Sequence, residues 1–318
     1  MTKLNRPLLR LGQALHARAY RFTTVTPLTH SRVNARVENA WATDLAGVFG
    51  WSRPFKRETV GEELFGLMDS ANILLDIQGG WRSAVRWSSI GDELYVHSCY
   101  PTSEHDAVFF GPDTYRFAQA IDQHLRRQPA EELRRVVDIG CGAGPGALLA
   151  AHACGNAEVY GLDINPTALE YTEVNARLAG VGNLRALRSD LLDGVSGQFD
   201  LILSNPPYML DPQARAYRHG GGELGAEFAM RLIDSALPRL MPGGTLLLYT
   251  GVAMVDGRDP LLEHCKTYLA GQDFVWGYRE MDPDVFAEQL LEQGYERVER
   301  IAAVVLTVTR QAAGHAQK

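Results

Sequence analysis

The sequence predicts an α/β fold, in which a doubly wound parallel sheet of seven strands follows a smaller helical and β-hairpin region. Two observations carry this prediction. From residue 131 onward, short apolar segments alternate with helical ones. Several of these apolar segments end in polar residues, as strands do where they meet at the carboxyl edge of a parallel sheet. The 318 residues suffice for two domains, or for one large domain with an extension.

The strand–helix alternation defines the larger region, and we place a ligand-binding domain over residues 106–318. Strands are expected at 135–139, 157–162, 183–188, 199–204, 245–250, 274–280 and 300–309. Helices are expected at 145–152, 169–178, 223–240, 261–269 and 283–292. The long helix at 223–240 should end before Pro242-Gly243-Gly244, because proline and glycine stop helices.

Residues 1–105 lack this alternation and are interpreted as a recognition domain. Helical spacing predicts helices in the leucine-rich first segment, at 34–41 and at 61–68. Residues 81–100 alternate between apolar and polar around Gly91-Asp92, which predicts a β-hairpin. The residues of this hairpin expected to face the core are Val85, Trp87, Leu94 and Val96. Aromatic residues of this region are assigned mainly to its core rather than to a base-stacking platform.

Composition is that of an ordinary globular protein, with 46% hydrophobic residues, 22% charged residues and a formal charge of −7. The charge is unevenly distributed. The first 60 residues hold ten Lys or Arg and three Asp or Glu, a net charge of +7 against −14 in the rest. A basic segment on an acidic body could bind RNA, a ribosome or an acidic protein surface. It could equally be a solvated helical face.

The cysteines at 99, 141, 154 and 265 form no CxxC pair and no metal-binding spacing with histidine. We therefore expect free thiols and no metal site. No apolar run approaches the roughly 20 residues that span a bilayer. These features favour a cytoplasmic protein without a membrane partner. The oligomeric state stays open, with a monomer favoured.

A glycine-rich loop, Asp138-Ile139-Gly140-Cys141-Gly142-Ala143-Gly144, follows the first strand of the expected sheet. Its glycines allow positive φ and let a ligand approach the backbone closely. The spacing differs from the G-x-G-x-x-G pattern that seats a pyrophosphate on a helix N-terminus. Asp138 also places a negative charge beside the loop. Both features favour a cationic ligand without phosphate groups.

The second and third strands end in acidic residues at the same edge of the sheet. Asp163, followed by Ile164, lies 19 residues after the last loop glycine, where a carboxylate can accept both ribose hydroxyl protons. The carboxylate of Asp190 can accept from an adenine amino group, and Leu191 can cover the ring face. Either aspartate alone could be a helix N-cap. Four strand ends in register favour a nucleoside site instead.

The fourth strand ends abruptly in Asn205-Pro206-Pro207-Tyr208. Two prolines remove two N–H donors, so neither the sheet nor a regular helix can continue. The Asn205 oxygen and the Pro206 carbonyl can each accept an N–H from a planar NH2 group, while Tyr208 stacks on the plane. A nitrogen held in this way can pyramidalise toward a methyl donor. Catalysis would come from orientation and from stabilising charge on nitrogen, without a strong general base.

The glycine loop, the acidic strand ends and the Asn-Pro-Pro-Tyr tetrad together resemble class I S-adenosylmethionine-dependent methyltransferases, which have a Rossmann-like fold. The tetrad is similar to that of members that methylate a planar nitrogen. Gly111-Pro112-Asp113-Thr114, the expected N-terminal region and the glycine-rich stretch at 219–225 resemble the release-factor glutamine N5-methyltransferase (HemK-like) family. The resemblance covers about residues 107–255. Glu223 in the glycine-rich stretch could close over the acceptor, or simply favour the first turn of a helix.

This resemblance implies S-adenosyl-L-methionine as the cofactor. The residues then expected to bind it are Asp138, Gly140, Cys141, Gly142, Gly144, Asp163, Ile164, Asp190, Leu191 and Asn205. The expected catalytic residues are Asn205, Pro206 and Tyr208.

The leading acceptor is a protein amide, such as a glutamine of a translation factor. The exocyclic amine of a base in ribosomal or transfer RNA and a small molecule of a biosynthetic pathway stay open. A nicotinamide dehydrogenase would need a pyrophosphate-binding loop and would leave the tetrad unexplained. A non-catalytic cofactor-binding scaffold is disfavoured, because Asn205 and Tyr208 are intact.

Overall fold

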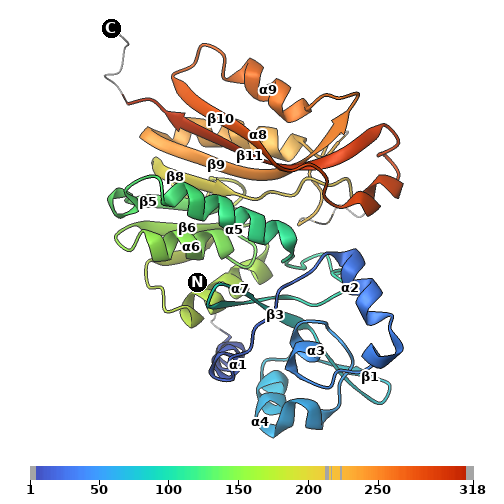
Figure 1. Ribbon diagram of the computed structural model, residues 1–318. Coiled ribbons are helices and arrows are strands. Elements are labelled where there is room, and N and C mark those ends of the chain that lie inside the picture. Colours follow the sequence, from blue (N-terminus) through green and yellow to red (C-terminus); the bar gives the residue numbers. More distant parts are fainter. Residues whose placement is uncertain (1–4, 212–214, 216, 223, 313–318) are drawn as a thin grey trace.

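The computed structural model describes residues 5–211, 215, 217–222 and 224–312, and its largest feature is a seven-stranded sheet (Figure 1). The strands are β5 (Arg135–Ile139), β6 (Glu158–Asp163), β7 (Leu184–Arg188), β8 (Phe199–Ser204), β9 (Leu240–Val255), β10 (Phe274–Asp282) and β11 (Val298–Arg310). Their order is β10-β11-β9-β8-β5-β6-β7. β11 runs antiparallel to both of its neighbours, β10 and β9, and the other neighbouring pairs are parallel. The doubly wound α/β sheet is confirmed.

Helices bury both faces of this sheet. They are α5 (Pro112–Leu125), α6 (Pro145–Ala153), α7 (Pro166–Leu178), α8 (Glu227–Ala236) and α9 (Pro260–Tyr268). Side chains alternate between the faces, so Val136 and Leu201 pack with α5 and α6. Val137 and Ile202 point the other way and pack with α8 and α9. Burial on both faces explains why these strands are nearly continuous apolar runs in the sequence.

The N-terminal part has its own apolar core and packs on the outer side of α7 (Figure 1). Its elements are α1 (Arg6–Ala17), α2 (Pro27–Asn34), α3 (Leu45–Phe49), α4 (Arg57–Ser70), β1 (Leu74–Ile77), β2 (Gly80–Ser83), β3 (Val85–Ile90) and β4 (Glu93–Ser98). The expected hairpin is β3-β4, and all four of its expected core residues are buried. Val174 of α7 joins the same core as Trp87 of β3. The aromatic residues of the hairpin are therefore core residues, as expected.

The helix expected at 34–41 is wrong. Instead α2 ends at Asn34, and Val37–Asn39 form only a short 3-10 turn. The helix begins about two turns earlier because the Thr26 hydroxyl accepts from the Thr29 backbone N–H and Pro27 occupies the first helical position.

Two expectations at the C-terminal end of the sheet also differ from the structure. The long helix is shorter than expected, and Pro242-Gly243-Gly244 lies within β9. The pairing with β8 shifts there, because Phe199 pairs with Leu240 whereas Leu201 pairs with Thr245. Proline and glycine are tolerated in a strand at such an irregularity. The helix expected at 283–292 is only a 3-10 segment, Ala287–Leu291.

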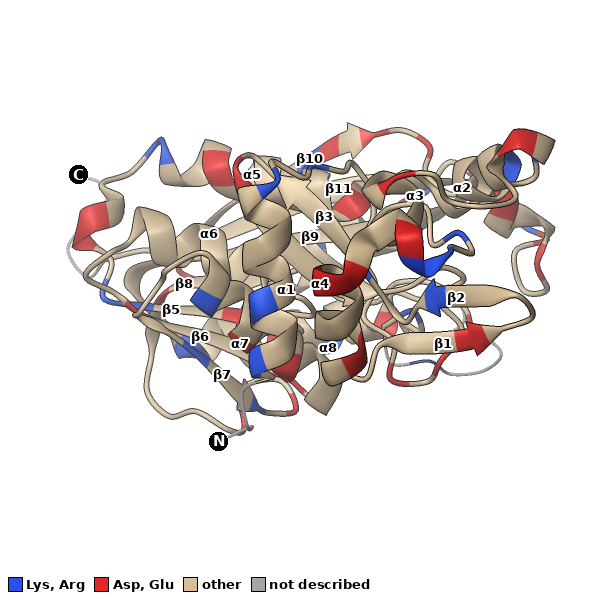
Figure 2. Cartoon of the chain, turned by 90° about the horizontal axis from the view of Figure 1, so that it is seen from below, with Lys and Arg blue, Asp and Glu red and all other residues tan. Residues whose placement is uncertain are grey.

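Part of the basic first segment is paired with acidic residues in the part of the chain that the structure describes. Three of its arginines pair with acids that follow residue 60 in the chain, namely Arg18 with Glu63, Arg21 with Asp92 and Arg57 with Glu62. Figure 2 shows basic residues on α1 and β2 and acidic ones on α4 and β1, which contact α1 and β2 respectively. Exposed ion pairs contribute only about 0–1 kcal/mol each. No described helix combines the length and apolarity that crossing a membrane requires.

Two helical glycines test the packing of α1. A Cβ on Gly12 would come within 2.6 Å of the fully buried Trp87 ring, whereas a Cβ on Gly66 of α4 would meet nothing within 4 Å. Gly12→Ala should therefore lower the free energy of unfolding by about 1–3 kcal/mol through overpacking. Gly66→Ala should raise it by about 0.5–1 kcal/mol through helix propensity. Urea unfolding measures both, and equal stabilisation by the two variants would contradict the packing of α1 on β3.

Candidate active site

One pocket opens at the carboxyl edge of the sheet, where β8, β5, β6 and β7 are neighbours. Each of these four strands contributes the residues at its end. Eleven of the residues expected to form the site line it, namely Asp138, Gly140, Cys141, Gly142, Asp163, Ile164, Asp190, Leu191, Asn205, Pro206 and Tyr208. Gly144 does not line this pocket, since it adopts φ 81° as the N-cap of α6 and faces Thr172 and Leu148. The structure therefore brings together residues that lie up to 70 positions apart in the sequence.

The glycine loop is held against β6. The backbone N–H groups of Gly140 and Cys141 both donate to the Leu162 carbonyl, at 2.8 and 2.9 Å. Gly140 and Gly142 adopt φ values of 70° and 56°, which favour glycine. A Cβ on Gly140 would meet no protein atom within 4 Å, so the loop leaves open space beside its backbone. This is the space that a ligand in close contact with the loop requires.

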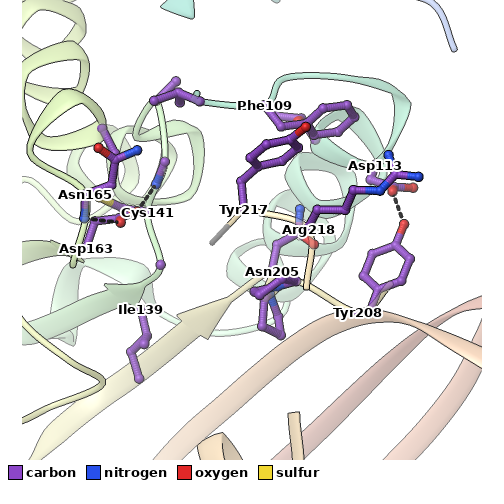
Figure 3. Close-up of a pocket in the computed structure, with 18 of the residues that line it drawn as sticks. Phe109, Asp113, Ile139, Cys141, Asp163, Asn165, Asn205, Tyr208, Tyr217 and Arg218 are labelled. Atoms are coloured by element: carbon purple, nitrogen blue, oxygen red, sulfur yellow. Dashed lines mark hydrogen bonds between the residues drawn. The ribbon is translucent and has the colours of Figure 1, made fainter. Parts of the chain in front are cut away.

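Asp163 supports the same loop with its carboxylate. One oxygen accepts from the Gly142 N–H at 3.0 Å, and the other accepts from the Asn165 N–H at 2.9 Å (Figure 3). Burial raises the pKa of Asp163, while the backbone hydrogen bonds lower it. Each oxygen keeps a second lone pair, because a carboxylate has about four acceptor sites. The carboxylate can therefore organise the loop and still accept from a ligand hydroxyl.

Asp138 has a buried oxygen that no described residue satisfies. It is only 1% exposed, and one of its oxygens accepts from the Ala147 N–H at 2.9 Å. No described residue hydrogen-bonds its other oxygen, Oδ1. Burial raises the pKa of Asp138 to about 8, and the neighbouring Asp163 charge adds to the effect. A buried acceptor without a partner is costly, so a cationic ligand group beside it would be stabilised.

The third strand end is exposed and strained. Asp190 is exposed, and Leu191 adopts φ 46°, an unfavourable conformation for leucine. The Ser189 hydroxyl fixes this turn by donating to the Leu191 carbonyl at 2.9 Å and accepting from the Gly194 N–H at 2.8 Å. Such strain is concentrated at ligand-binding positions.

The Asn-Pro-Pro-Tyr turn forms the opposite wall of the pocket from the Asp163 side (Figure 3). The preceding Ser204 hydroxyl donates to the Ile139 carbonyl at 2.8 Å and so ties the end of β8 to the end of β5. Asn205 is half-buried, and among the described residues its carboxamide has no hydrogen-bond partner. Its oxygen is therefore available to a ligand.

Tyr208 is more confined than an exposed stacking platform would be. Its ring is 9% exposed and lies against the backbone of Gly251, where a Cβ would come within 2.2 Å of ring carbon Cε2. Its hydroxyl donates to the carboxylate of Asp113 (Figure 3). Stacking of Tyr208 on an acceptor stays a prediction.

Several pocket residues were not expected from the sequence. They are Pro27, Phe109, Asp113, Asn165, Tyr217, Arg218, Phe228 and Phe286. The rings of Phe109 and Tyr217 lie nearly parallel, with centroids 6.2 Å apart, and the Tyr217 hydroxyl donates to the Thr102 carbonyl at 2.7 Å. Asp113 and Asn165 had local signals, since Pro112 and Pro166 each mark the start of a helix. Glu223 lies outside the described residues.

The chain is similar to known methyltransferases. The family model described as methyltransferase small domain matches residues 114–254. The chain is 37% identical to a release factor glutamine methyltransferase of Deinococcus radiodurans over 46% of this chain and 55% of that protein. It is 33% identical to a Methanocaldococcus jannaschii protein assigned to the N5-glutamine methyltransferases, over 42% of this chain and 71% of that protein.

The chain belongs to the HemK-like family of S-adenosylmethionine-dependent methyltransferases. A tRNA m1G37 methyltransferase of M. jannaschii shares the fold, with a TM-score of 0.50 and 18% identity over 74% of this chain and 60% of that one. The matches to most of the curated relatives span only about half of their length, as the 55% for the D. radiodurans protein shows.

The cofactor of this HemK-like protein is S-adenosylmethionine, and the residues of the pocket fit it. The free Oδ1 of Asp138 suits the cationic end of the cofactor. The open space at Gly140 suits contact with the loop backbone, and the carboxylate of Asp163 suits a ribose. No described group of three or more His, Cys, Asp or Glu could hold a metal ion.

The raised pKa of Asp138 predicts a pH-dependent stability. In the folded, cofactor-free protein this carboxyl stays protonated up to about pH 8, whereas in the unfolded chain it ionises near pH 4. Folding therefore binds a proton between these values, and wild type loses stability as pH rises through this window. Asp138→Asn removes this loss and keeps an acceptor for Ala147. Urea unfolding without cofactor should show its advantage over wild type growing from about pH 4 to about pH 8 and then levelling off; a pH-independent difference would contradict the burial of an unpaired carboxyl.

Proposed function

We propose that this protein transfers a methyl group from S-adenosylmethionine to the side-chain amide nitrogen of a glutamine in a protein acceptor. The observation that carries the proposal is the position of Asn205. Its carboxamide has no partner among the described residues, and it faces a pocket that continues to the glycine loop. The Asn205 oxygen and the Pro206 carbonyl are acceptors, which match the two N–H groups of a primary amide.

The binding residues divide the pocket into two parts. On one side, Asp163 and Asp190 would accept from the ribose hydroxyls and the adenine amino group, with Ile164 and Leu191 against the ring. Asp138 would face the cationic end of the cofactor. When bound, S-adenosylmethionine supplies an electrophilic methyl group on a sulfonium. On the other side, Asn205 and its neighbours would hold the acceptor.

Orientation supplies most of the catalysis in this scheme. An amide nitrogen is a poor nucleophile, because its lone pair is delocalised. Two acceptors on its N–H groups hold the nitrogen and favour pyramidal geometry toward the methyl group, an effect of positioning that can be worth several kcal/mol. The same acceptors stabilise positive charge as it develops on nitrogen. The methylated nitrogen is acidic and loses its proton late, so no strong base is required.

We also propose that residues 1–105 form an acceptor-recognition domain and that the acceptor is a translation factor in the cytoplasm. Pro27 of α2 lines the same pocket as Asn205, which gives the N-terminal part access to anything bound there. The interspersed charges of this part favour a protein surface over an RNA backbone, because RNA binding requires a continuous basic surface. Relatives named for glutamine methylation support the same acceptor class.

A pair of variants should separate acceptor chemistry from cofactor binding. Asn205→Ala should lower the turnover number by about 100-fold or more, because the nitrogen is no longer held. Cofactor affinity, measured by calorimetry, should stay within about threefold of wild type, because the lost contact is made mainly to the reacting nitrogen. Asp163→Ala should weaken cofactor binding by about 10-fold or more, through loss of hydrogen bonds to a charged group. Weaker cofactor binding by Asn205→Ala, with cofactor affinity unchanged in Asp163→Ala, would contradict the assignment of an acceptor side and a cofactor side.

The acceptor itself is tested with labelled S-adenosylmethionine and a fractionated bacterial extract. We expect label in protein, absent with Asn205→Ala, and a methylated glutamine in the mass spectrum of the labelled protein. If nuclease treatment removes the label, the acceptor is a nucleic acid and the proposed protein acceptor is contradicted. Label in small molecules alone would contradict it too.

A further inference from the structure

A buried carboxylate connects the acceptor side of the pocket to three other elements. Asp113, the second residue of α5, is 3% exposed. It accepts from the Tyr208 hydroxyl, from the Tyr249 hydroxyl at 2.7 Å and from the Arg116 guanidinium at 3.3 Å. Arg116 in turn pairs with Asp282 of β10 at 2.7 Å. Helix α5, the turn after β8, strand β9 and strand β10 therefore meet at this group.

Burying a carboxylate is expensive unless it is well paired. Burial raises the pKa of Asp113, whereas the hydrogen bonds from Tyr208 and Tyr249 and the charge of Arg116 lower it. The helix N-terminus adds favourable partial positive charge. Unlike Asp138, this carboxylate has a partner on each oxygen. It is built as an anchor rather than as a base with a free lone pair aimed at substrate.

Tyr208 is the residue through which this anchor reaches the acceptor. The turn is held by the Ser204 hydroxyl on one side and by the Met209 N–H, which donates to the Arg218 carbonyl at 2.9 Å, on the other. Between them, the prolines at 206 and 207 have no N–H to donate. Among the described residues we find no backbone hydrogen bond from residues 205–208. The phenol of Tyr208 is thus the tether of the segment that carries Asn205.

We propose that Asp113 is a positioning residue: by holding the Tyr208 hydroxyl, it fixes the turn that presents the Asn205 oxygen and the Pro206 carbonyl to the acceptor nitrogen. The expected effect on turnover rests on the proposed methyl transfer. The structural consequence, a turn ordered by one side-chain hydrogen bond, is independent of what the protein methylates.

The two tyrosines on Asp113 provide a matched test. Tyr208→Phe and Tyr249→Phe each remove one hydroxyl from the same carboxylate and keep the ring. Tyr249 lies in β9 and does not line the pocket, so its loss leaves the turn tethered. Tyr208→Phe should lower the turnover number by about 10- to 100-fold with cofactor affinity unchanged, because the acceptor groups lose their orientation. The turnover number of Tyr249→Phe should stay within about threefold of wild type, because this variant affects stability alone.

A double-mutant cycle tests whether Asp113 acts through Tyr208. If it does, Asp113→Asn combined with Tyr208→Phe should cost no more turnover than the larger of the single losses. If the double variant instead loses turnover by the product of the two single losses, the inference is overturned. Thermal unfolding of each variant identifies any effect that comes from loss of the fold.

Hydrogen–deuterium exchange gives a readout that requires no activity. Exchange in the segment 204–211 should be faster in Tyr208→Phe and Asp113→Asn than in wild type, and unchanged in Tyr249→Phe. Equal exchange in the two tyrosine variants would overturn the inference even if the wild type were inactive. A wild type that transfers methyl groups to no protein would overturn the proposed function instead, and leave the exchange result to decide the role of Asp113.

Discussion

The pairing of β8 with β5 is the constraint on which the site depends. The two strands run parallel, Ser204 lies opposite Ile139, and the Ser204 hydroxyl donates to the Ile139 carbonyl. Parallel strands end at the same edge, so the turn after β8 is placed next to the loop after β5. In the proposed function, a methyl donor held by the loop and an acceptor nitrogen held by the turn would face one another. Because β5 also pairs with β6, Asp163 completes the same edge.

Two buried aspartates have opposite electrostatic roles. Asp138 has an oxygen without a partner among the described residues, which a cationic or hydrogen-bond-donating ligand group can satisfy. Asp113 is saturated by two phenols and a guanidinium, and it holds neighbouring groups in place. The first arrangement costs stability in the free protein and can be compensated by binding. The second costs desolvation and yields a fixed geometry at the acceptor side. Neither aspartate acts as a free general base. The proposed methylation of an amide does not require one.

Local patterns were sufficient for the strands that carry the site. The segments 135–139 and 199–204 were predicted at the bounds they have in the structure, because each is an apolar run bounded by polar or turn residues. Glycines and prolines at the strand ends disclosed the loop and the turn. Gly144 shows the limit of such reasoning, because its positive φ serves the start of α6 rather than contact with the pocket.

Contacts between distant residues had no such signal. Tyr208 and Asp113 are separated by 95 positions, and nothing near either residue indicates the other. The extension of β9 through Pro242-Gly243-Gly244 follows from pairing with β8 on both sides of these residues, which overrides local propensity. The aromatic residues Phe109, Tyr217 and Phe286 come from irregular segments and reach the pocket only through the tertiary fold.

The central claim is that cofactor and acceptor amide meet between the loop after β5 and the turn after β8. A crystal structure with S-adenosylhomocysteine and a glutamine-containing peptide tests it most directly. The account predicts the ribose on Asp163 and the amide nitrogen within hydrogen-bond distance of both the Asn205 oxygen and the Pro206 carbonyl, in line with the sulfur. An amide bound away from Asn205, or a nucleoside bound away from Asp163, would contradict the account.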